Sequence, residues 1–321
     1  MKNKLTTQIL WTLALLLLVA PSSFATAQYE EEEEWSRSFD IGPNGSFALS
    51  NISGDLVIRG GAGEQVQIQA VKEVHRAGSD AEAKRQLERV DIEVTHTGNR
   101  LRVITRYEER SESDRDSSVS VAFEVIVPSG TEVSAKSVSG DIEVTNVQGE
   151  LKAETVSGEV EIQEAEKLVS AKSVSGNVEV DSARGTENIE ISSVSGDVKV
   201  DGLEASRVTF ESVSGDIEIT DADCGRASIK TVSGDVRYVG SLEASGRYEF
   251  KSHSGDVNIA VSGDTGFEID AKSFSGEIES DFPLEVHSVG GERRKLNGVY
   301  GDGSAYIEAT TFSGDVNIEK R

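Results

Sequence analysis

The second half of the chain repeats one short pattern, in which Ser-Gly is followed by an acid or by Asn. The glycines of this pattern are Gly140, Gly158, Gly176, Gly196, Gly215, Gly234, Gly255, Gly276 and Gly314. Successive copies lie 18 to 21 residues apart, except for a final gap of 38 residues that is close to two periods. This gap predicts that one coil near residues 299–309 has lost the pattern while keeping its length. A fixed period of this size, with two short strands per unit, is typical of a solenoid.

The composition favours strands over helices. Hydrophobic residues make up 36% of the chain and aromatic residues only 6%, and the apolar positions are mostly Val and Ile among Ser, Thr and Glu. One unit cannot bury its own apolar face, so coils must stack at the strand spacing of about 4.8 Å. We therefore predict an all-β fold, a right-handed parallel β-solenoid (β-helix) with about 19 residues per coil. The right hand is predicted because parallel strands are generally joined by right-handed crossovers.

Alternation along the repeat assigns an inward and an outward face. In residues 136–144 it predicts that Val138, Ile142 and Val144 point inward, whereas Ser139 and Asp141 point outward. The column through Val138 continues in Val156, Val174, Val194, Val213 and Val232, and then in His253, Phe274 and Phe312. The larger residues at its end predict a core that widens toward the C-terminus.

The motif glycine is expected at a corner between two strands, where a positive φ or a tight bend excludes a β-carbon. The sequence therefore predicts that a Gly140→Val change lowers the thermal midpoint.

The residues that follow the motif glycines form a second column. They are Asp141, Glu159, Asn177, Asp197, Asp216, Asp235, Asp256, Glu277 and Asp315. In one interpretation these short acids accept hydrogen bonds from backbone amides at the corner and keep the rod soluble. In the other they bind Ca²⁺, with Asp141, Asp197, Asp216, Asp235 and Asp256 as candidate ligands. The first is favoured because the glycine-rich nonapeptide of calcium-binding solenoids is absent, and no other cofactor is predicted.

The N-terminus has the features of a secretory signal peptide at residues 1–27. Lys2 and Lys4 precede an apolar run at 9–20, and residues 25–27 offer a small-residue cleavage site. An uncleaved anchor is the alternative, but twelve apolar residues are short for a bilayer span. We expect an exported protein, periplasmic, at the cell surface or secreted, without a stable membrane span after cleavage.

The remaining chain divides into three predicted parts. Residues 28–38 are expected to be an acidic, solvated leader. Residues 39–130 are expected to form an N-terminal β region with one helix at 79–92, where Ser79 and Glu82 match a capping box. Residues 131–321 contain the solenoid repeats. The tips of a solenoid expose strand edges, so end-to-end self-association is expected unless they are capped, for which the helix is a candidate at the N-terminal tip.

The net charge of -25, from 57 acids and 32 bases, excludes nucleic acid as a partner. Cys224 is the single cysteine, and the four histidines, at 75, 96, 253 and 287, show no metal-ligand spacing. The acid column with Lys199, Lys230 or Arg237 could in principle form an enzymatic site, but the acids repeat along the rod and do not converge. The segment at 281–306, with His287 and residues 293–295, is an alternative site for a carbohydrate.

The repeats around SVSGDIEV, with residues 121–144 and 296–318, resemble the bacterial adhesin family of unknown function (domain of unknown function 4097). The resemblance covers about residues 40–320. It implies a β-solenoid protein of the cell envelope and supplies no catalytic residues. The sequence thus predicts a non-enzymatic adhesin or structural scaffold that presents a repetitive acidic surface to an envelope polymer or protein. The alternative is a carbohydrate-binding or carbohydrate-active protein with its site at 281–306.

Overall fold

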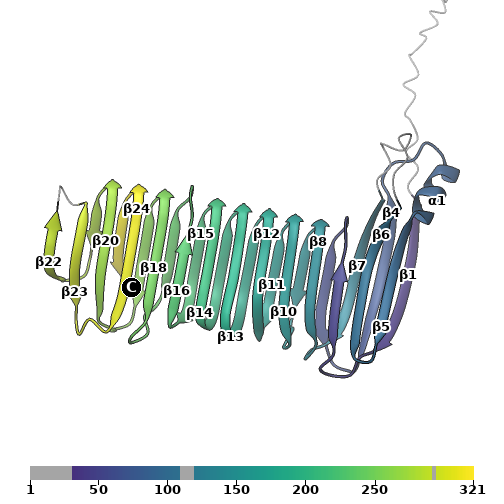
Figure 1. Cartoon of the computed structure of the whole chain (residues 1–321), viewed down its shortest axis with the longest axis horizontal. Helices are drawn as coiled ribbons and strands as arrows, with labels where there is room; N and C mark the ends of the chain where they lie inside the picture. Colours follow the sequence, from purple (N-terminus) through teal and green to yellow (C-terminus); the bar gives the residue numbers. More distant parts are fainter. Residues whose placement is uncertain (1–30, 109–118, 291–293) are drawn as a thin grey trace, which may run out of the picture.

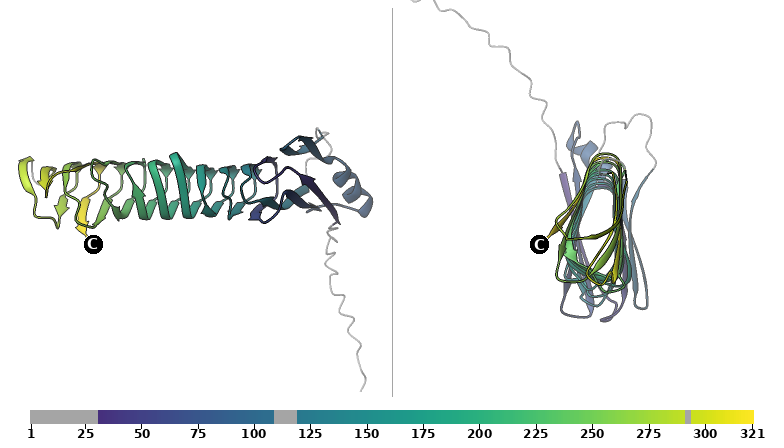
Figure 2. Two further views of the ribbon diagram at one scale, coloured as in Figure 1. Left: turned by 90° about the horizontal axis from the view of Figure 1, so that it is seen from below. Right: turned by 90° about the vertical axis from the view of Figure 1, so that its left-hand side faces the viewer.

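A computed structural model describes residues 31–108, 119–290 and 294–321 (Figure 1). The predicted signal peptide lies outside these residues. Parallel strands run across a rod, and an N-terminal lobe occupies one end. Seen along the long axis, the rod is a flattened loop of two facing sheets (Figure 2). The prediction of an all-β, solenoid-like fold with one short helix is confirmed, whereas the hand of the coil and its length stay predictions.

The lobe and the two sheets of the rod have the following elements. The lobe contains β1 (Glu31–Asp40), β4 (Gln65–Val74), α1 (Asp80–Glu88), β5 (Val90–Thr97), β6 (Arg100–Tyr107) and β7 (Val119–Pro128). The first sheet contains, in spatial order, β2 (Ser46–Ser50), β8 (Glu132–Ser139), β10 (Glu150–Ser157), β12 (Lys167–Ser175), the second halves of β13 (Val178–Ser195) and β14 (Val198–Ser214), β16 (Arg226–Lys230), β18 (Arg247–Ser254), β24 (Ala305–Ser313) and β20 (Phe267–Ser275). The second sheet contains β3 (Leu56–Gly61), β9 (Ile142–Thr145), β11 (Val160–Ala165), the first halves of β13 and β14, β15 (Ile217–Cys224), β17 (Val236–Ser241), β19 (Val257–Ser262), β25 (Val316–Lys320) and β21 (Ile278–Ser280).

The core lies between the two sheets of the rod. Ile142 and Val144 point inward and are buried, as the alternation predicts. One buried column changes from Ala135, Ala153 and Ala171 to Ile191, Phe210, Ile229 and Phe250 along the rod. The column ends in Ala309 and Ala271, so its large residues lie in the middle of the rod. The predicted widening of the core toward the C-terminus is therefore wrong for this column.

The motif glycines allow successive corners to touch. Gly140 and Gly158 have φ values of 143° and 150°, in the region that favours glycine. A β-carbon on Gly158 would lie 2.2 Å from the carbonyl oxygen of Gly140, the equivalent residue of the neighbouring coil. A side chain at this position would therefore push two coils apart.

The N-terminal lobe closes one end of the rod. β1 and β7 flank β4 in antiparallel pairing, and β5 pairs antiparallel with β6. The single helix of the described residues, α1, begins after Ser79, whose Oγ accepts a hydrogen bond from the amide of Glu82 at 3.3 Å. It ends at Glu88, so the predicted extension to residue 92 is wrong. Ala83 and Leu87 are buried, and α1 contacts β1, β4 and β5 at the tip.

The prediction of a solvated acidic leader at residues 28–38 needs correction. The described part of this segment belongs to β1, which pairs with β4 from Glu31 to Asp40. Lys72, itself buried, lies 3.3 Å from the carboxylate of Glu33, and Lys84 lies 3.6 Å from Glu31. Consecutive acids on an outer strand discourage pairing with another chain. The acidic run is thus compatible with an edge strand.

The order of the coils at the C-terminal end differs from the order of the chain. The last coil, β24 with β25, lies between β18 with β19 and β20 with β21. Residues between these coils form an antiparallel hairpin of β22 (Glu285–Gly290) and β23 (Lys295–Tyr300), which pairs with β20 at the tip (Figure 1). The prediction of a coil that lost its motif is therefore wrong. The gap of 38 residues is close to two periods because it contains the inserted hairpin as well as the displaced coil.

We predict that Gly140→Ala destabilises the protein far more than Gly63→Ala. Both glycines have positive φ, but a β-carbon on Gly140 would meet the Gly54 carbonyl oxygen at 2.3 Å, whereas Gly63 has open space. Backbone strain costs about 1–3 kcal/mol at either site, and only Gly140→Ala adds the collision. Urea unfolding of both variants measures the difference. Equal losses of stability would contradict the close approach of the corners.

Candidate interaction surfaces

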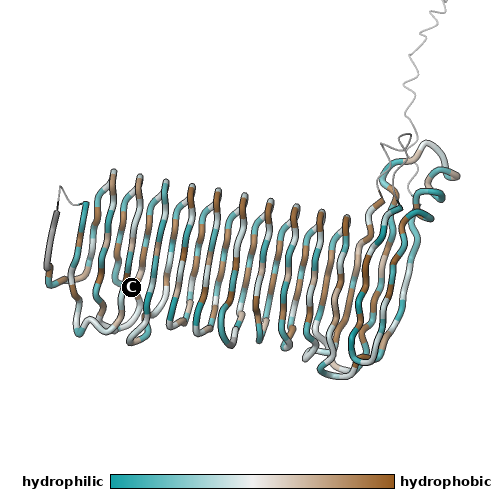
Figure 3. The backbone as a smooth tube through the Cα atoms, in the orientation of Figure 1, coloured by the Kyte–Doolittle hydropathy of each residue, from teal (hydrophilic) through white to brown (hydrophobic). Residues whose placement is uncertain are grey.

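An exposed row of apolar side chains follows one corner of the rod. We call it the apolar ladder; in spatial order it contains Ile52, Val138, Val156, Val174, Val194, Val213, Val232, His253, Phe312 and Phe274. Its Val, Ile and Phe members are between 43% and 66% exposed. The prediction that this column points inward is wrong. Figure 3 shows hydrophobic segments recurring at the upper corner of successive coils.

The residue before each ladder position explains the error. Ser137 and Ile142 both point inward although they are five positions apart, so the two-residue alternation breaks at the Gly140 corner. From Thr155 onward, the inward hydroxyls form a hydroxyl ladder, in which each donates a hydrogen bond to the motif glycine carbonyl of a neighbouring coil. The pairs are Thr155 with Gly140, Ser173 with Gly158, Ser193 with Gly176, Ser212 with Gly196, Thr231 with Gly215, Ser252 with Gly234, Thr311 with Gly255 and Ser273 with Gly314, at 2.8–3.4 Å.

The C-terminal end of the apolar ladder is aromatic. The ring of Phe312 stacks on His253 at 4.9 Å and on Phe274 at 4.6 Å, with interplanar angles of 15° and 5°. Phe312 lies between the other two because its coil is inserted between theirs. The expectation that His253 packs in the core is wrong, since its side chain is exposed.

The acid column links neighbouring corners. Oδ1 of Asp216 accepts a hydrogen bond from the amide of Asp235 at 2.8 Å, and Asp235 does the same for Asp256. Further contacts of this kind, at 2.8–3.0 Å, use Asp55, Asp141, Asn177, Asp197, Asp256 and Asp315 as acceptors. Asn177 fits the column because its carbonyl oxygen also accepts. This geometry matches the interpretation in which the acids serve the corner, although the amide belongs to the next coil.

The structure places the five calcium candidates, Asp141, Asp197, Asp216, Asp235 and Asp256, in this single line, one per coil. Ca²⁺ usually takes six to eight oxygen ligands. Within residues 31–108, 119–290 and 294–321, no group of three or more His, Cys, Asp or Glu side chains is arranged to hold a metal ion. Calcium binding stays an untested prediction.

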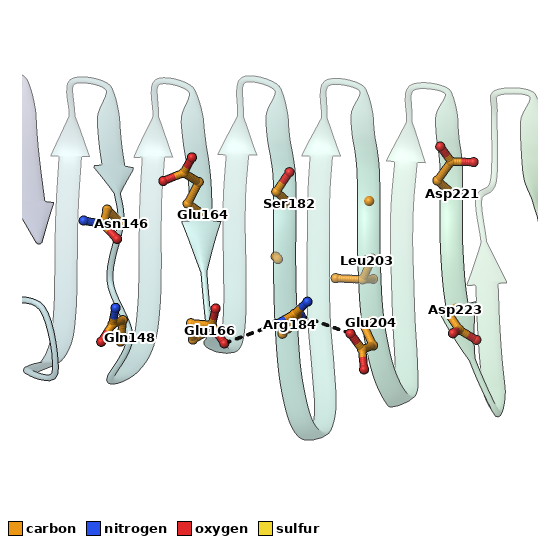
Figure 4. Close-up of a pocket in the computed structure, with 12 residues that line it drawn as sticks. Asn146, Gln148, Glu164, Glu166, Ser182, Arg184, Leu203, Glu204, Asp221 and Asp223 are labelled. Carbon is orange, nitrogen blue, oxygen red and sulfur yellow. Dashed lines mark ion pairs between the residues drawn. The ribbon is translucent and has the colours of Figure 1, made fainter.

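An acidic groove of about 510 Å³ runs across the ends of strands in the second sheet (Figure 4). One row contains Asn146, Glu164, Ser182, Gly202 and Asp221, all with φ between 51° and 71°. A second row contains Gln148, Glu166, Arg184, Glu204 and Asp223. Arg184 lies 3.7 Å from Glu166 and 3.0 Å from Glu204. This groove was not predicted from the sequence. The available signal was the Asn, Gly and Asp at equivalent positions of successive coils, because these residues favour left-handed backbone.

The residues considered for enzymatic chemistry do not converge. His75 and His96 lie in the lobe, near Ser120 Oγ and the Gly98 carbonyl oxygen respectively, whereas His253 lies near the other end. Arg237, on β17, contacts Glu218 in the second sheet. The pairing places Lys199, on β14, in the same outward row of that sheet. Lys230, on β16, belongs to the first sheet.

Glu249 and Cys224 are among the groups of the rod whose pKa values are shifted. Hydrogen bonding from Lys251, with a further contribution from Lys230, lowers the pKa of Glu249 to about 2. This carboxylate is partly buried and forms ion pairs with Lys230 and Lys251. Burial raises the pKa of the Cys224 thiol to about 12, which makes it a poor nucleophile.

The segment at 281–306 is a terminal hairpin and not an irregular coil. Phe267, Phe282 and Tyr300 pack together at its base, with ring centroids 4.8–5.5 Å apart. Arg293 and the side chain of His287 lie outside the described residues. The proposed carbohydrate site at 281–306 therefore stays an untested prediction. None of the helices described here has the length and apolarity needed to cross a membrane.

We predict that Asp216→Asn is nearly neutral, whereas Asp216→Ala loses about 1 kcal/mol because the Asp235 amide loses its acceptor. Urea unfolding of both variants measures this difference.

We also expect EDTA, and then millimolar Ca²⁺, to leave the thermal midpoint of the unmutated protein unchanged. A calcium-dependent rise that Asp216→Asn abolishes would instead establish a metal site.

Comparison with solved structures finds chains of similar extent but low sequence identity. A candidate adhesin from Parabacteroides distasonis ATCC 8503 is 12% identical, covers 90% of this chain over 97% of its own and has a TM-score of 0.45. A candidate lipid-binding protein from the same strain is 12% identical, with coverages of 90% and 96% and a TM-score of 0.41. A candidate adhesin from Bacteroides fragilis NCTC 9343 is 14% identical, with coverages of 90% and 97% and a TM-score of 0.36.

The family model gives a firmer result than these structures. No curated protein matches the chain significantly. The model described as Toastrack DUF4097 matches residues 46–319, which include the rod and most of the lobe. The chain therefore belongs to the Toastrack DUF4097 family, as the sequence resemblance predicted.

Proposed function

We propose that this protein is an exported, non-enzymatic scaffold of the cell envelope, an adhesin in the broad sense, that holds a polymer or protein partner along the rod. The observation that carries this proposal is the exposure of the apolar ladder on coil after coil. A linear array of equal contacts suits many weak interactions with one extended partner better than it suits catalysis.

The energetics favour contact along the whole row. A valine that is already half-buried, such as Val156 or Val213, gains about 1 kcal/mol when a partner covers the rest of its side chain. Each such contact is weak, but the rod holds the side chains in register, so the second and later contacts are intramolecular. Contiguous exposed apolar surface of this kind commonly marks an interaction site.

The polar groups support a binding role without turnover. The acids of the corner are used as acceptors for the amides of the next coil, and they recur evenly along the rod. The acidic groove adds a second repeated surface beside the apolar one. Export rests on the signal-like N-terminus, and the periplasm, the cell surface and the medium are all compatible with it.

Retention of coated beads under flow tests this proposal. Beads carrying residues 28–321 are expected to stay on alkyl-coated glass several-fold longer than beads carrying a Val213→Ser, Val232→Ser double variant. A control variant changes Gln67 and Gln69 to Ser, two exposed polar positions on β4 of the lobe, and should behave as the unmutated protein. Equal retention of the ladder variant and the unmutated protein would refute adhesion through this surface.

A further inference from the structure

A groove of about 650 Å³ lies where the apolar ladder meets the N-terminal lobe. We call it the wall groove. β2 pairs with β6 up to Ser50 and Ile104, after which β2 turns into the corner at Asn51. β6 continues to Tyr107, so Thr105 and Arg106 stand beside the start of the ladder as a wall. The volume lies in the range of small-molecule sites.

The floor of the wall groove is the first half of the apolar ladder. Ile52, Val138, Val156, Val174 and Val194 line it. Neighbouring members are one strand spacing apart, so the row spans about 19 Å. This is a narrow apolar track with the dimensions of one extended alkyl chain.

The charge of the wall groove is opposite to that of the protein. Its charged lining residues are Arg106, Lys136, Lys172 and Glu154, a net charge of +2 on a chain whose net charge is -25. The acidic groove, in contrast, is lined by five acids and Arg184. The wall groove is therefore complementary to an anion.

The three cations of the wall groove retain capacity for a ligand. Their present partners are Glu93 for Arg106 Nε at 2.8 Å, Glu154 for Lys136 at 2.7 Å and Glu190 for Lys172 at 2.6 Å. These ion pairs are solvent-exposed, and exposed pairs are weak. A guanidinium has five N–H donors, so one carboxylate contact does not saturate Arg106.

The hydroxyl ladder is interrupted at this groove. Thr105, Asn51 and Ser137 occupy the three equivalent inward positions before Thr155, and all three are at least 95% buried. Thr105 Oγ1, Asn51 Oδ1 and Ser137 Oγ have no hydrogen-bond partner among the described residues, although Asn51 Nδ2 donates to the carbonyl oxygens of Ser53, Gly54 and Val121. These residues line the groove. Their side chains point inward, so they form the buried backing of the groove and leave its outer face to the cations and the apolar ladder.

We propose that the wall groove binds a single-chain anionic amphiphile, a carboxylate head group on a long alkyl chain. The head group lies near Arg106, with Lys136 and Lys172 as the other cations of the lining. The alkyl chain lies along Val138, Val156 and Val174. This site goes beyond the proposed scaffold role, because it uses the junction with the lobe and not the repeated corner alone.

Isothermal titration of residues 28–321 with sodium laurate, below its micelle concentration, tests the proposal. Val156→Ser is expected to raise the Kd about tenfold, as for the loss of one apolar contact in a ligand pocket. Val213→Ser is the matched control, since Val213 has the same 46% exposure on the same ladder but lies outside the groove. Arg106→Gln is expected to weaken laurate binding by a similar factor, and octanoate should bind more weakly than laurate.

Three results would overturn the site. They are the absence of laurate binding up to millimolar concentration, equal weakening by Val156→Ser and Val213→Ser, and tighter binding of dodecyltrimethylammonium than of laurate. Thermal melts of the variants check that the fold is intact. Failure of the scaffold function and failure of this site can be told apart. The Val213→Ser, Val232→Ser double variant should reduce bead retention and leave laurate binding unchanged. Arg106→Gln should weaken laurate binding and leave bead retention unchanged.

Discussion

The close approach of one glycine corner to the next is the constraint on which the rod depends. A β-carbon on Gly176 would lie 1.9 Å from the carbonyl oxygen of Gly158, so the coils stack at this corner only because the side chain is absent. The same carbonyl accepts a hydrogen bond from Ser173, which points into the core. Each corner therefore combines a steric requirement for glycine with a hydrogen bond that satisfies a carbonyl in the interior.

The surface of the rod follows from this corner. Because the inward position before it is used by a hydroxyl, the next residue, such as Val174, must point to solvent. The acid after the glycine then accepts a hydrogen bond from a backbone amide of the following coil, and this bond links the outer sides of neighbouring corners. Repetition thus produces an apolar row and an acidic row on neighbouring tracks. The lobe interrupts both the hydroxyl ladder and the apolar track, and at that junction the surface becomes cationic.

Much of the architecture could be predicted from the sequence, because period and alternation report stacking directly. The rod, the glycine corner and the inward positions of Ile142 and Val144 are of this kind. The orientation of Val138 could not be obtained by simple alternation, because a bend with positive φ changes which residues face inward. The order of the last coils was also hidden, since periodicity counts residues along the chain and β24 is displaced in space. The wall groove needs β6 beside the ladder, a contact between distant segments that no local pattern encodes.

Thiol labelling tests the orientation of the corner most directly. Cys224, the single native cysteine, is 1% exposed and has a raised pKa, so the unmutated protein should label only when unfolded. Cysteine is introduced in place of Val174 in one variant and of Ser173 in another, and maleimide reactivity is measured under native conditions. Fast labelling of the Val174→Cys variant and protection of the Ser173→Cys variant are expected. Protection at position 174 with fast labelling at 173, in variants whose melting shows an intact fold, would contradict this orientation.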